Sequence, residues 1–191
     1  LTYVIYLIAR PVTQLYSTPE KSPITSWAYS ILGQIYVVLP LALLGVWGYK
    51  SDYQLFMNTE YLLMALFVFV WTNDTGAYIV GCTLGKHRLF ERISPKKSWE
   101  GFFGGLAFCI ILASLANYII PGMLSTAQWI GMGILTSIFS TWGDLCESLL
   151  KRTAGVKDSG KILPGHGGIL DRFDSELIAS PVIFIYLTFV L

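Results

Sequence analysis

The sequence has 191 residues, of which 54% are hydrophobic and only 13% are charged, and its mean hydropathy is +0.59. Because soluble domains usually carry about 25% charged residues, this composition excludes an ordinary soluble domain. The formal net charge of +1 carries little information, and we expect no nucleic-acid partner. The composition predicts an all-α, polytopic membrane helical bundle.

Apolar segments follow one another along the whole chain. From Gly101 to Gly143 there is no Lys, Arg, Asp or Glu, which suits two spans of about 20 residues each, hinged near Pro121-Gly122. The predicted spans are 1–9 (partial), 27–47, 61–82, 101–120, 127–150 and 177–191. There is no initiator Met and the chain stops inside an apolar run, so we expect a single transmembrane domain, 1–191, truncated at one or both ends.

Two long polar loops, 83–100 and 151–176, contain ten of the 13 Lys and Arg residues. Two predicted spans separate these loops, so both must lie on the same side of the membrane. Because short loops rich in Lys and Arg face the cytoplasm, we expect both loops there and 48–60 and 121–126 outside.

Asp74 lies inside the predicted span 61–82, where a carboxylate costs about 3 kcal/mol or more unless it is paired or hydrated. Trp71, Tyr78 and Gly81 share its helical face. Asp74 is either a buried carboxylate paired for packing specificity or a residue that lines a polar site. We favour the second interpretation.

A polar stripe follows one face of the predicted span 127–150, at spacings of three and four residues. Its members are Ser137, Ser140, Thr141, Asp144, Glu147, Ser148 and Lys151. Because lipid offers no hydrogen-bond partners, such a stripe lines a hydrated cavity or faces other polar helices. Hydroxyls bonding back to their own helix would explain the serines, but not Asp144 and Glu147.

The first polar loop ends in Lys96 and Lys97, directly before a predicted helix start at Ser98. Ser98 suits the N-cap position, and Glu100 suits the positive end of the helix dipole. Two cations beside a helix N-terminus form a good anion site. An ordinary positive loop that contacts lipid headgroups explains the same residues equally well.

The stretch 148–175 is dense in polar residues and lies between two apolar segments. Its cations suit phosphates, its carboxylates suit a hard cation such as magnesium, and its glycines let the backbone approach a ligand. These residues are Lys151, Arg152, Lys157 and Lys161; Asp158, Asp171 and Asp174; and Gly165, Gly167 and Gly168. His166 has three open roles: metal ligand, general base or loop hydrogen-bonder. Together they predict a phosphate-and-metal site at a membrane surface.

The residues of this stretch resemble the hallmark of the phosphatidate cytidylyltransferases, also called CDP-diacylglycerol synthases. The pattern is Ser148-x-x-Lys151-Arg152-x4-Lys157-Asp158-x5-Pro164-Gly165-His166-Gly167-Gly168-x2-Asp171-Arg172-x-Asp174. The segments Asn73-Asp74-x3-Tyr78-x2-Gly81 and Ser94-Pro95-Lys96-Lys97-Ser98-Trp99-Glu100-Gly101 also resemble that family. The resemblance covers about residues 62–176, while 1–61 match only as apolar spans.

The resemblance implies a helical membrane enzyme that joins CTP and phosphatidic acid into CDP-diacylglycerol and pyrophosphate, in a polar cavity open to the cytoplasm and the bilayer. It implies magnesium on Asp144 and Asp171, with a second, monovalent cation such as K⁺ beside it. Lys151, Arg152, Lys157 and Arg172 would hold phosphates, Asp74 would orient a cation or water, and Lys96 and Lys97 would bind the second anionic group. We also assign Ser148, Asp158, His166, Gly167, Gly168 and Asp174 to substrate binding.

The expected location is the bacterial inner membrane, with the site facing the cytoplasm, and the number of subunits stays open, a homodimer included. Two alternatives remain: a CTP-dependent polyprenol or dolichol kinase, and an ion-coupled transporter that uses Asp74 and Asp144. The spacing of Cys82, Cys109 and Cys146 matches neither a disulfide framework nor a zinc site.

Overall fold

The computed structural model describes residues 5, 6, 9, 12, 13, 15, 16, 22–48, 59–160, 162 and 167–191. The chain divides into two compact units, 1–39 and 40–191. Most of the partial span predicted at 1–9 lies outside the described residues. The second unit contains every element discussed below as part of a site.

The first long helical segment begins four residues earlier than the predicted span 27–47. Helix α2 (Pro23–Gly33) continues through a π-helical turn, η1 (Gln34–Val38), into α3 (Leu39–Gly48). The earlier start has a local cause, because proline at the first helical position is preset for helix and has no N–H to leave unsatisfied. Residues Ile24–Val46 are long and apolar enough to cross a membrane.

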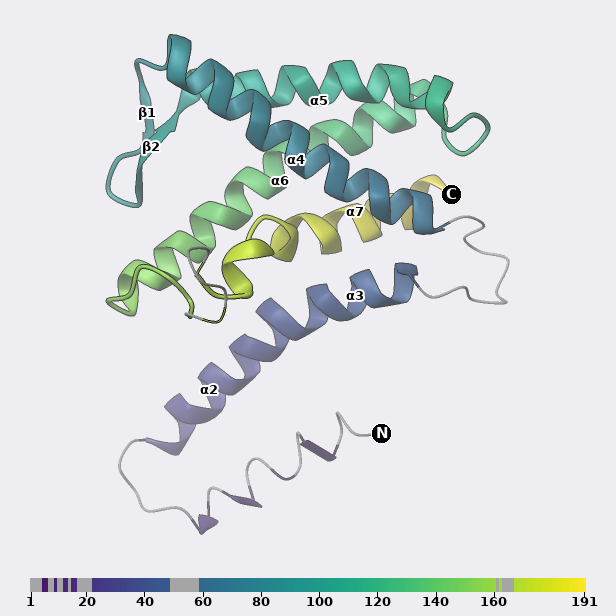
Figure 1. The fold of residues 1–191 in the computed structure, drawn as a ribbon. Coiled ribbons are helices and arrows are strands. Elements are labelled where there is room, and N and C mark those ends of the chain that lie inside the picture. The colour runs from purple at the N-terminus through teal and green to yellow at the C-terminus, as the bar shows by residue number, and fades with distance from the viewer. Residues whose placement is uncertain are drawn as a thin grey trace. The chain divides into compact units, whose positions relative to one another are not determined.

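Four further helices form a bundle in the second unit: α4 (Thr59–Leu84), α5 (Trp99–Ile119), α6 (Thr126–Thr153) and α7 (Glu176–Val190). Helix α5 packs against α4 and α6, and α7 packs against α6 (Figure 1). Helices α4 and α5 also have the length and apolar composition of membrane spans, over Glu60–Leu84 and Trp99–Ile119. The predicted all-α membrane bundle is confirmed.

Helix α6 differs from its neighbours although it is the longest, at 28 residues. It is not among the three described helices whose composition alone qualifies them to cross a membrane. The polar stripe lowers its hydropathy, and much of that stripe is buried, including Ser137 and Ser140 at 0% exposure. The polar groups of α6 therefore face protein, which lets a long helix remain inside an apolar bundle.

The turns between these helices follow the local sequence. Ser98 caps α5 by accepting a hydrogen bond from the Gly101 N–H at 3.1 Å, as predicted. Gly122 adopts a φ of 78° in the predicted hinge, a conformation that glycine accepts without strain. Ser125 and Gln128 then form a capping box that starts α6.

The predicted loop 83–100 contains a short antiparallel hairpin, β1 (Arg88–Phe90) and β2 (Ser94–Ser98). The strands pair with an irregular register, Arg88 opposite Ser98 and Phe90 opposite Ser94. The Trp99 N–H donates to the His87 carbonyl at 2.9 Å, which ties the hairpin to the start of α5. Figure 1 shows the hairpin at the end where α4 and α5 meet.

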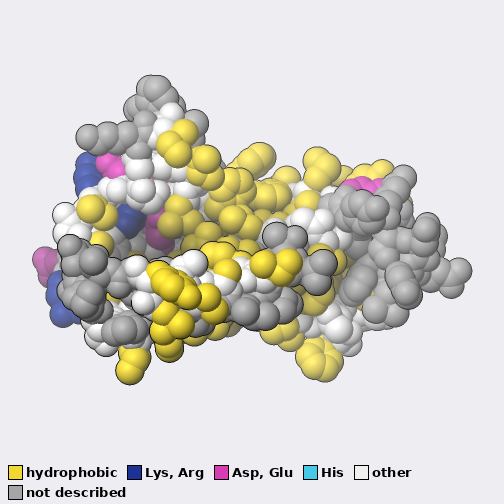
Figure 2. All heavy atoms as spheres, turned by 90° about the horizontal axis from the view of Figure 1, so that it is seen from below, with side chains coloured by type: hydrophobic (Ala, Val, Ile, Leu, Met, Phe, Trp, Pro, Cys, Tyr) yellow, Lys and Arg dark blue, Asp and Glu magenta, His cyan; other side chains and the backbone are white. Residues whose placement is uncertain are grey.

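The apolar core lies toward the other end of α4 and α6. Phe69, Cys109, Trp129 and Met132 are at most 2% exposed, and the Phe69 and Trp129 rings lie 6.3 Å apart. Viewed from below, the described charged side chains, all of which belong to the second unit, gather mostly toward one end (Figure 2). The bundle therefore has an apolar end and a polar end.

Candidate active site

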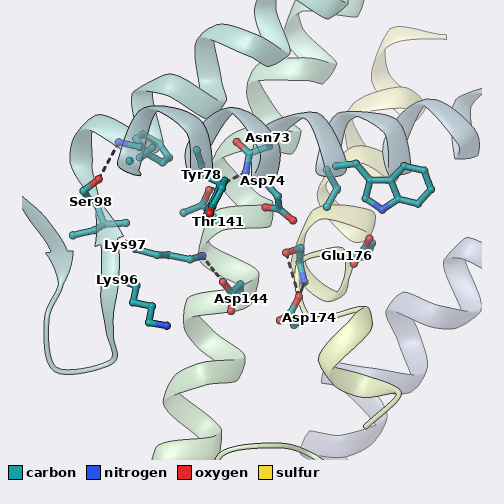
Figure 3. Close-up of a pocket in the computed structure, with 18 of the residues that line it drawn as sticks. Asn73, Asp74, Tyr78, Lys96, Lys97, Ser98, Thr141, Asp144, Asp174 and Glu176 are labelled. Atoms are coloured by element: carbon teal, nitrogen blue, oxygen red, sulfur yellow. Dashed lines mark hydrogen bonds and ion pairs between the residues drawn. The ribbon is translucent and has the colours of Figure 1, made fainter. Parts of the chain in front are cut away.

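A cavity of about 570 Å³ opens at the polar end of the bundle. Segments far apart in the sequence form its walls: α4, the hairpin with the first turn of α5, α6, and the segment that leads into α7. Its charged lining residues are Asp74, Lys96, Lys97, Asp144, Asp171, Arg172, Asp174 and Glu176. Figure 3 shows Lys97 extending from β2 toward Asp144, with Asp74, Asp174 and Glu176 grouped nearby.

Helix α4 contributes one continuous face to this cavity. Trp71, Asp74, Tyr78 and Gly81 all line it, at the three- and four-residue spacing of a helical face. Gly81 lies against the start of α5, where a Cβ would come 3.6 Å from the Gly101 Cα. Asp74 lines this cavity together with the hairpin cations Lys96 and Lys97.

Asp144 is held by groups from two elements. Its Oδ2 forms an ion pair with Lys97 Nζ, and its Oδ1 accepts a hydrogen bond from Ser148 Oγ at 3.3 Å. The Asp144 side chain still exposes 30% of its surface, so it remains accessible from the cavity. A carboxylate and an ammonium group in one open cavity can together bind a phosphate and the cation that accompanies it.

Asp171 accepts hydrogen bonds from four donor groups. Lys151 Nζ donates at 2.8 Å, the Ser159 N–H and Oγ both at 2.9 Å, and the Gly168 N–H at 2.7 Å. Burial alone would raise the pKa of Asp171, but these donors hold it well below its usual range. Gly167, with a φ of 81°, makes the turn that presents the Gly168 N–H. Asp171 thus anchors the loop after α6.

Lys151 connects this loop to α6. Besides Asp171, it contacts Glu147 Oε2 at 2.9 Å. The Glu147 side chain is only 2% exposed, and its other oxygen, Oε1, has no hydrogen-bond partner. One lysine therefore serves two carboxylates, Glu147 and Asp171, and of these only Asp171 is among the described lining residues of the cavity.

Asp174 shows the effect of that negative charge. Burial, followed by the charges of Asp144 and Glu147, raises its pKa well above the usual range of a carboxyl group. The backbone of Asp174 lies directly on α6, because a Cβ at Gly143 would come 2.7 Å from the Asp174 carbonyl oxygen. Only glycine fits this contact, which brings the carboxylates of α6 and of the segment before α7 together.

Comparison with known proteins bears directly on this cavity. A model of the cytidylyltransferase family matches residues 1–190. The chain belongs to the cytidylyltransferase family. The resemblance found in the polar motifs is therefore confirmed at the level of the family.

Curated relatives of this cytidylyltransferase family member carry the name phosphatidate cytidylyltransferase. Those from Staphylococcus aureus (strain COL) and Staphylococcus haemolyticus (strain JCSC1435) are 41% identical over 160 and 159 residues. One from Staphylococcus epidermidis (strain ATCC 12228 / FDA PCI 1200) is 40% identical over 159 residues. The matched region is 83% of this chain and 61% of each relative, so the chain spans less than two thirds of their length.

The structure brings many of the predicted site residues of this family member to the cavity or directly behind it. Lining the cavity are Asp74, Lys96, Lys97, Asp144, Asp171, Arg172 and Asp174. Behind them, Ser148 donates to Asp144, Lys151 and Gly168 donate to Asp171, and Gly167 shapes the turn. Arg152, Lys157 and Asp158 lie exposed and are not among the described lining residues. His166 lies outside the described residues.

Neither Glu176 nor Asn73 was assigned a role from the sequence. Glu176 lines the cavity, although a glutamate at the start of an apolar run occupies the position of an ordinary first-turn carboxylate. Asn73 also lines the cavity and is 1% exposed. Its signal was present, since a buried amide next to Asp74 inside an apolar run needs partners as much as the carboxylate does.

The carboxylates fit a magnesium ion of the kind that binds together with a substrate. Within the described ranges, no three acidic, Cys or His side chains converge on one point at ligand distance. Magnesium is commonly held by one or two carboxylates plus substrate phosphates, so a complete protein cage is not required. Glu147 Oε1 has no hydrogen-bond partner among the described residues, and after burial the charges of Asp144 and Glu147 help to raise the pKa of Asp174, so a cation would be favoured beside these carboxylates.

Proposed function

We propose that this chain is the catalytic region of a phosphatidate cytidylyltransferase. Its substrates would be CTP and phosphatidic acid, and its products CDP-diacylglycerol and pyrophosphate. One observation carries the proposal: Lys97 from the hairpin and Asp144 from α6 meet in a single cavity that Arg172 and Asp74 also line. The names of the Staphylococcus relatives support the same reaction.

The proposed reaction is an in-line nucleotidyl transfer. A phosphate oxygen of phosphatidate forms a bond to the α-phosphorus of CTP, while the bond from that phosphorus to the β-phosphate oxygen breaks. Pyrophosphate leaves with the electron pair. Because a phosphate monoester is already a nucleophile near neutral pH, no strong general base is needed. Positioning and charge neutralisation therefore account for most of the catalysis.

The cations of the cavity would bind the two anionic substrates. Lys96 and Lys97 lie on the hairpin, and Arg172 lies on η2 (Leu170–Arg172), so they approach a bound phosphate from different walls. Lys151 is already engaged by Glu147 and Asp171, and we assign it to holding the loop against α6. Arg152 and Lys157, on the exposed surface, would contact the part of the triphosphate that extends beyond the cavity.

Asp144 and Asp171 would hold magnesium, with a monovalent cation such as K⁺ beside it. The bound metal would neutralise charge on the phosphate oxygens and on the leaving pyrophosphate. Asp144 offers an accessible carboxylate. At Asp171 four donor groups already occupy the carboxylate, so binding there requires one donor to move away.

The membrane setting follows from the two substrates. Moving acyl chains out of the bilayer costs about 0.8 kcal/mol per methylene, so the reacting phosphates must meet near headgroup depth. Asp144 lies six residues before Leu150, where the predicted span ends, which is roughly 9 Å of helix. We therefore place the cavity at the cytoplasmic face of a bacterial inner membrane, open sideways to lipid and roofed by the loop 151–176.

A CTP-dependent release of pyrophosphate tests this function. The purified full-length protein in lipid nanodiscs receives magnesium and CTP, with or without phosphatidate, and both pyrophosphate and CDP-diacylglycerol are measured. We expect both products only when phosphatidate is present, and neither from Asp144→Asn. CDP release with phosphorylation of a polyprenol would instead identify a lipid kinase. Ion flux without any nucleotide reaction would identify a transporter.

A further inference from the structure

A buried hydrogen-bond cluster joins α4 to α6 at the wall of the cavity, which Asn73 and Thr141 line. At its centre is Asn73, which is 1% exposed. Its Oδ1 accepts from Ser137 Oγ at 2.7 Å, and its Nδ2 contacts Ser140 Oγ at 3.2 Å and Thr141 Oγ1 at 3.3 Å. All three partners belong to α6, so a single side chain of α4 is bonded to successive turns of the other helix.

The hydroxyl protons of this cluster require an amide at position 73. Ser140 Oγ donates to the Ser137 carbonyl at 3.2 Å, and Thr141 Oγ1 donates to the same carbonyl at 3.0 Å. Each hydroxyl has one proton, so toward residue 73 both can only accept. Asparagine supplies the two N–H donors that they need. An aspartate of the same shape would present oxygen to oxygen.

The cluster sets the rotation of α4 about its own axis. Asp74 follows Asn73 directly, and Asp144 follows Thr141 by three residues, or slightly less than one turn. Successive residues of an α-helix are about 100° apart around its axis. If α4 rotated by that angle, the neighbouring residue would meet α6 and Asp74 would point out of the cavity. Apolar contacts between helices allow some sliding, whereas these hydrogen bonds are directional.

Helix α5 closes the third side of the cluster. At Gly105, a Cβ would come 2.5 Å from Asn73 Oδ1 and 2.7 Å from the Asn73 carbonyl oxygen. The absence of a side chain at Gly105 therefore gives the amide its space. Three helices meet at Asn73, which explains how a polar side chain fits inside an apolar bundle.

We infer that Asn73 is a positioning residue that holds Asp74 and Asp144 toward the same cavity. The expected effect on kcat rests on the proposed cytidylyl transfer. The expected effect on the arrangement of α4 and α6 rests on the hydrogen-bond cluster alone. Asn73 acts through the helix that carries Asp74, so its loss changes the alignment of the reacting groups more than the affinity for CTP.

The test compares two identical substitutions at different places. Asn73→Asp reverses the hydrogen-bonding pattern in the cluster, while Asn117→Asp changes a half-buried amide of α5 that donates to Thr126 Oγ1 at 3.5 Å, away from the described cavity lining. We expect Asn73→Asp to lower kcat roughly 100-fold, with KM for CTP changed less than about 3-fold. Asn117→Asp should leave both constants unchanged.

A second measurement reports the geometry without any reaction. Cys82 on α4 and Cys146 on α6 are exposed, whereas Cys109 is buried, so spin labels can be attached to the first two in the full-length protein. We expect the distance between the labels to shift or broaden in Asn73→Asp and to stay unchanged in Asn117→Asp. Normal kcat together with a shifted distance, or lost kcat with an unchanged distance, would overturn the positioning role.

If Asn73→Asp does not fold, Gly105→Ala tests the positioning role of Asn73 instead. This substitution adds one methyl group against Asn73 and changes no polar atom. It should reproduce both the lower kcat and the shifted label distance, and an unaltered kcat and distance would contradict the inference. If the unmodified protein transfers no cytidylyl group, the proposed function fails, while the label distances still show whether Asn73 sets the arrangement of α4 and α6.

Discussion

Each half of α6 has buried residues, yet these are stabilised in different ways in the two halves. In the first half, Trp129 and Met132 are 0% exposed and belong to an apolar cluster with Phe69. In the second half, Ser140 is also 0% exposed, but its Oγ accepts a hydrogen bond from Asn73 Nδ2, and Ser137, near the middle of the helix, donates to Asn73 Oδ1. Burial alone therefore does not distinguish the core from the site. The distinction lies in whether the buried group requires one particular partner.

The consequence is a difference in what each half tolerates. An apolar contact loses energy in proportion to the volume removed, and its neighbours can partly relax. A buried polar group that loses its partner keeps its full desolvation cost. We therefore expect substitutions in the first half to change stability, and substitutions in the second half to change turnover.

Asp144→Asn should have the largest effect on turnover, about a 1,000-fold loss. The substitution keeps the size and the Ser148 contact but removes the charge that pairs with Lys97 and that a hard cation requires. Steady-state pyrophosphate release measures the loss, and thermal unfolding in detergent should shift by only a few degrees. Turnover within 10-fold of the unmodified protein, at ordinary magnesium levels, would refute the assignment of Asp144.

The sequence predicted this end of the bundle well for a physical reason. Lipid offers no partners, so Asp74 and the stripe on α6 could only face protein or water, and both line or border the cavity. The hairpin cations were predicted to bind an anion or lipid, but the pairing of Lys97 with Asp144 depends on the packing of α5 against α4. No local pattern encodes that contact.

The sequence predicted neither the place of Glu176 in the cavity nor the hairpin. Glu176 became a cavity residue because Gly143 lets the segment before α7 lie directly on α6. A first-turn glutamate is otherwise common on any helix. The hairpin was likewise absent from the prediction, because its strands are short and β2 contains Pro95. Tertiary contacts decided both cases.

Lys151→Met should lower turnover about 100-fold and also loosen the loop after α6. The lysine side chain is 16% exposed and bridges Glu147 and Asp171, so its removal leaves two poorly solvated carboxylates without their shared cation. Hydrogen exchange over residues 154–160 should become faster. Lys86→Met provides the control, because Lys86 is exposed and lies outside the described cavity lining. Equal effects of the two substitutions would mean that total charge, rather than the bridge, matters.

Gly143→Ala and Gly133→Ala compare the two halves of α6 with the same added methyl group. At Gly143 a Cβ would come 2.7 Å from the Asp174 carbonyl oxygen, which is backbone and cannot swing away. We expect about a 10-fold loss of turnover as Asp174 and Glu176 are pushed outward. At Gly133 the nearest atom is the Cys109 carbonyl oxygen at 3.1 Å, so a small shift of α5 suffices. Gly133→Ala should alter the melting temperature and leave turnover within about 2-fold.

Trp129→Ala should have the smallest effect on turnover and a large effect on stability. The indole is fully buried beside Phe69 at the apolar end. Removing such a side chain lowers the free energy of unfolding by about 3 to 5 kcal/mol, because the surrounding residues fill the space it leaves only in part. Well below its lowered melting temperature, the variant should retain turnover within about 2-fold, since Trp129 is not among the described residues that line the active-site cavity. A kcat that falls as far as in Gly143→Ala, with the protein still folded, would show that the two halves of α6 are coupled. The hydrogen bonds of Asn73 would then not isolate the site from changes in the apolar packing.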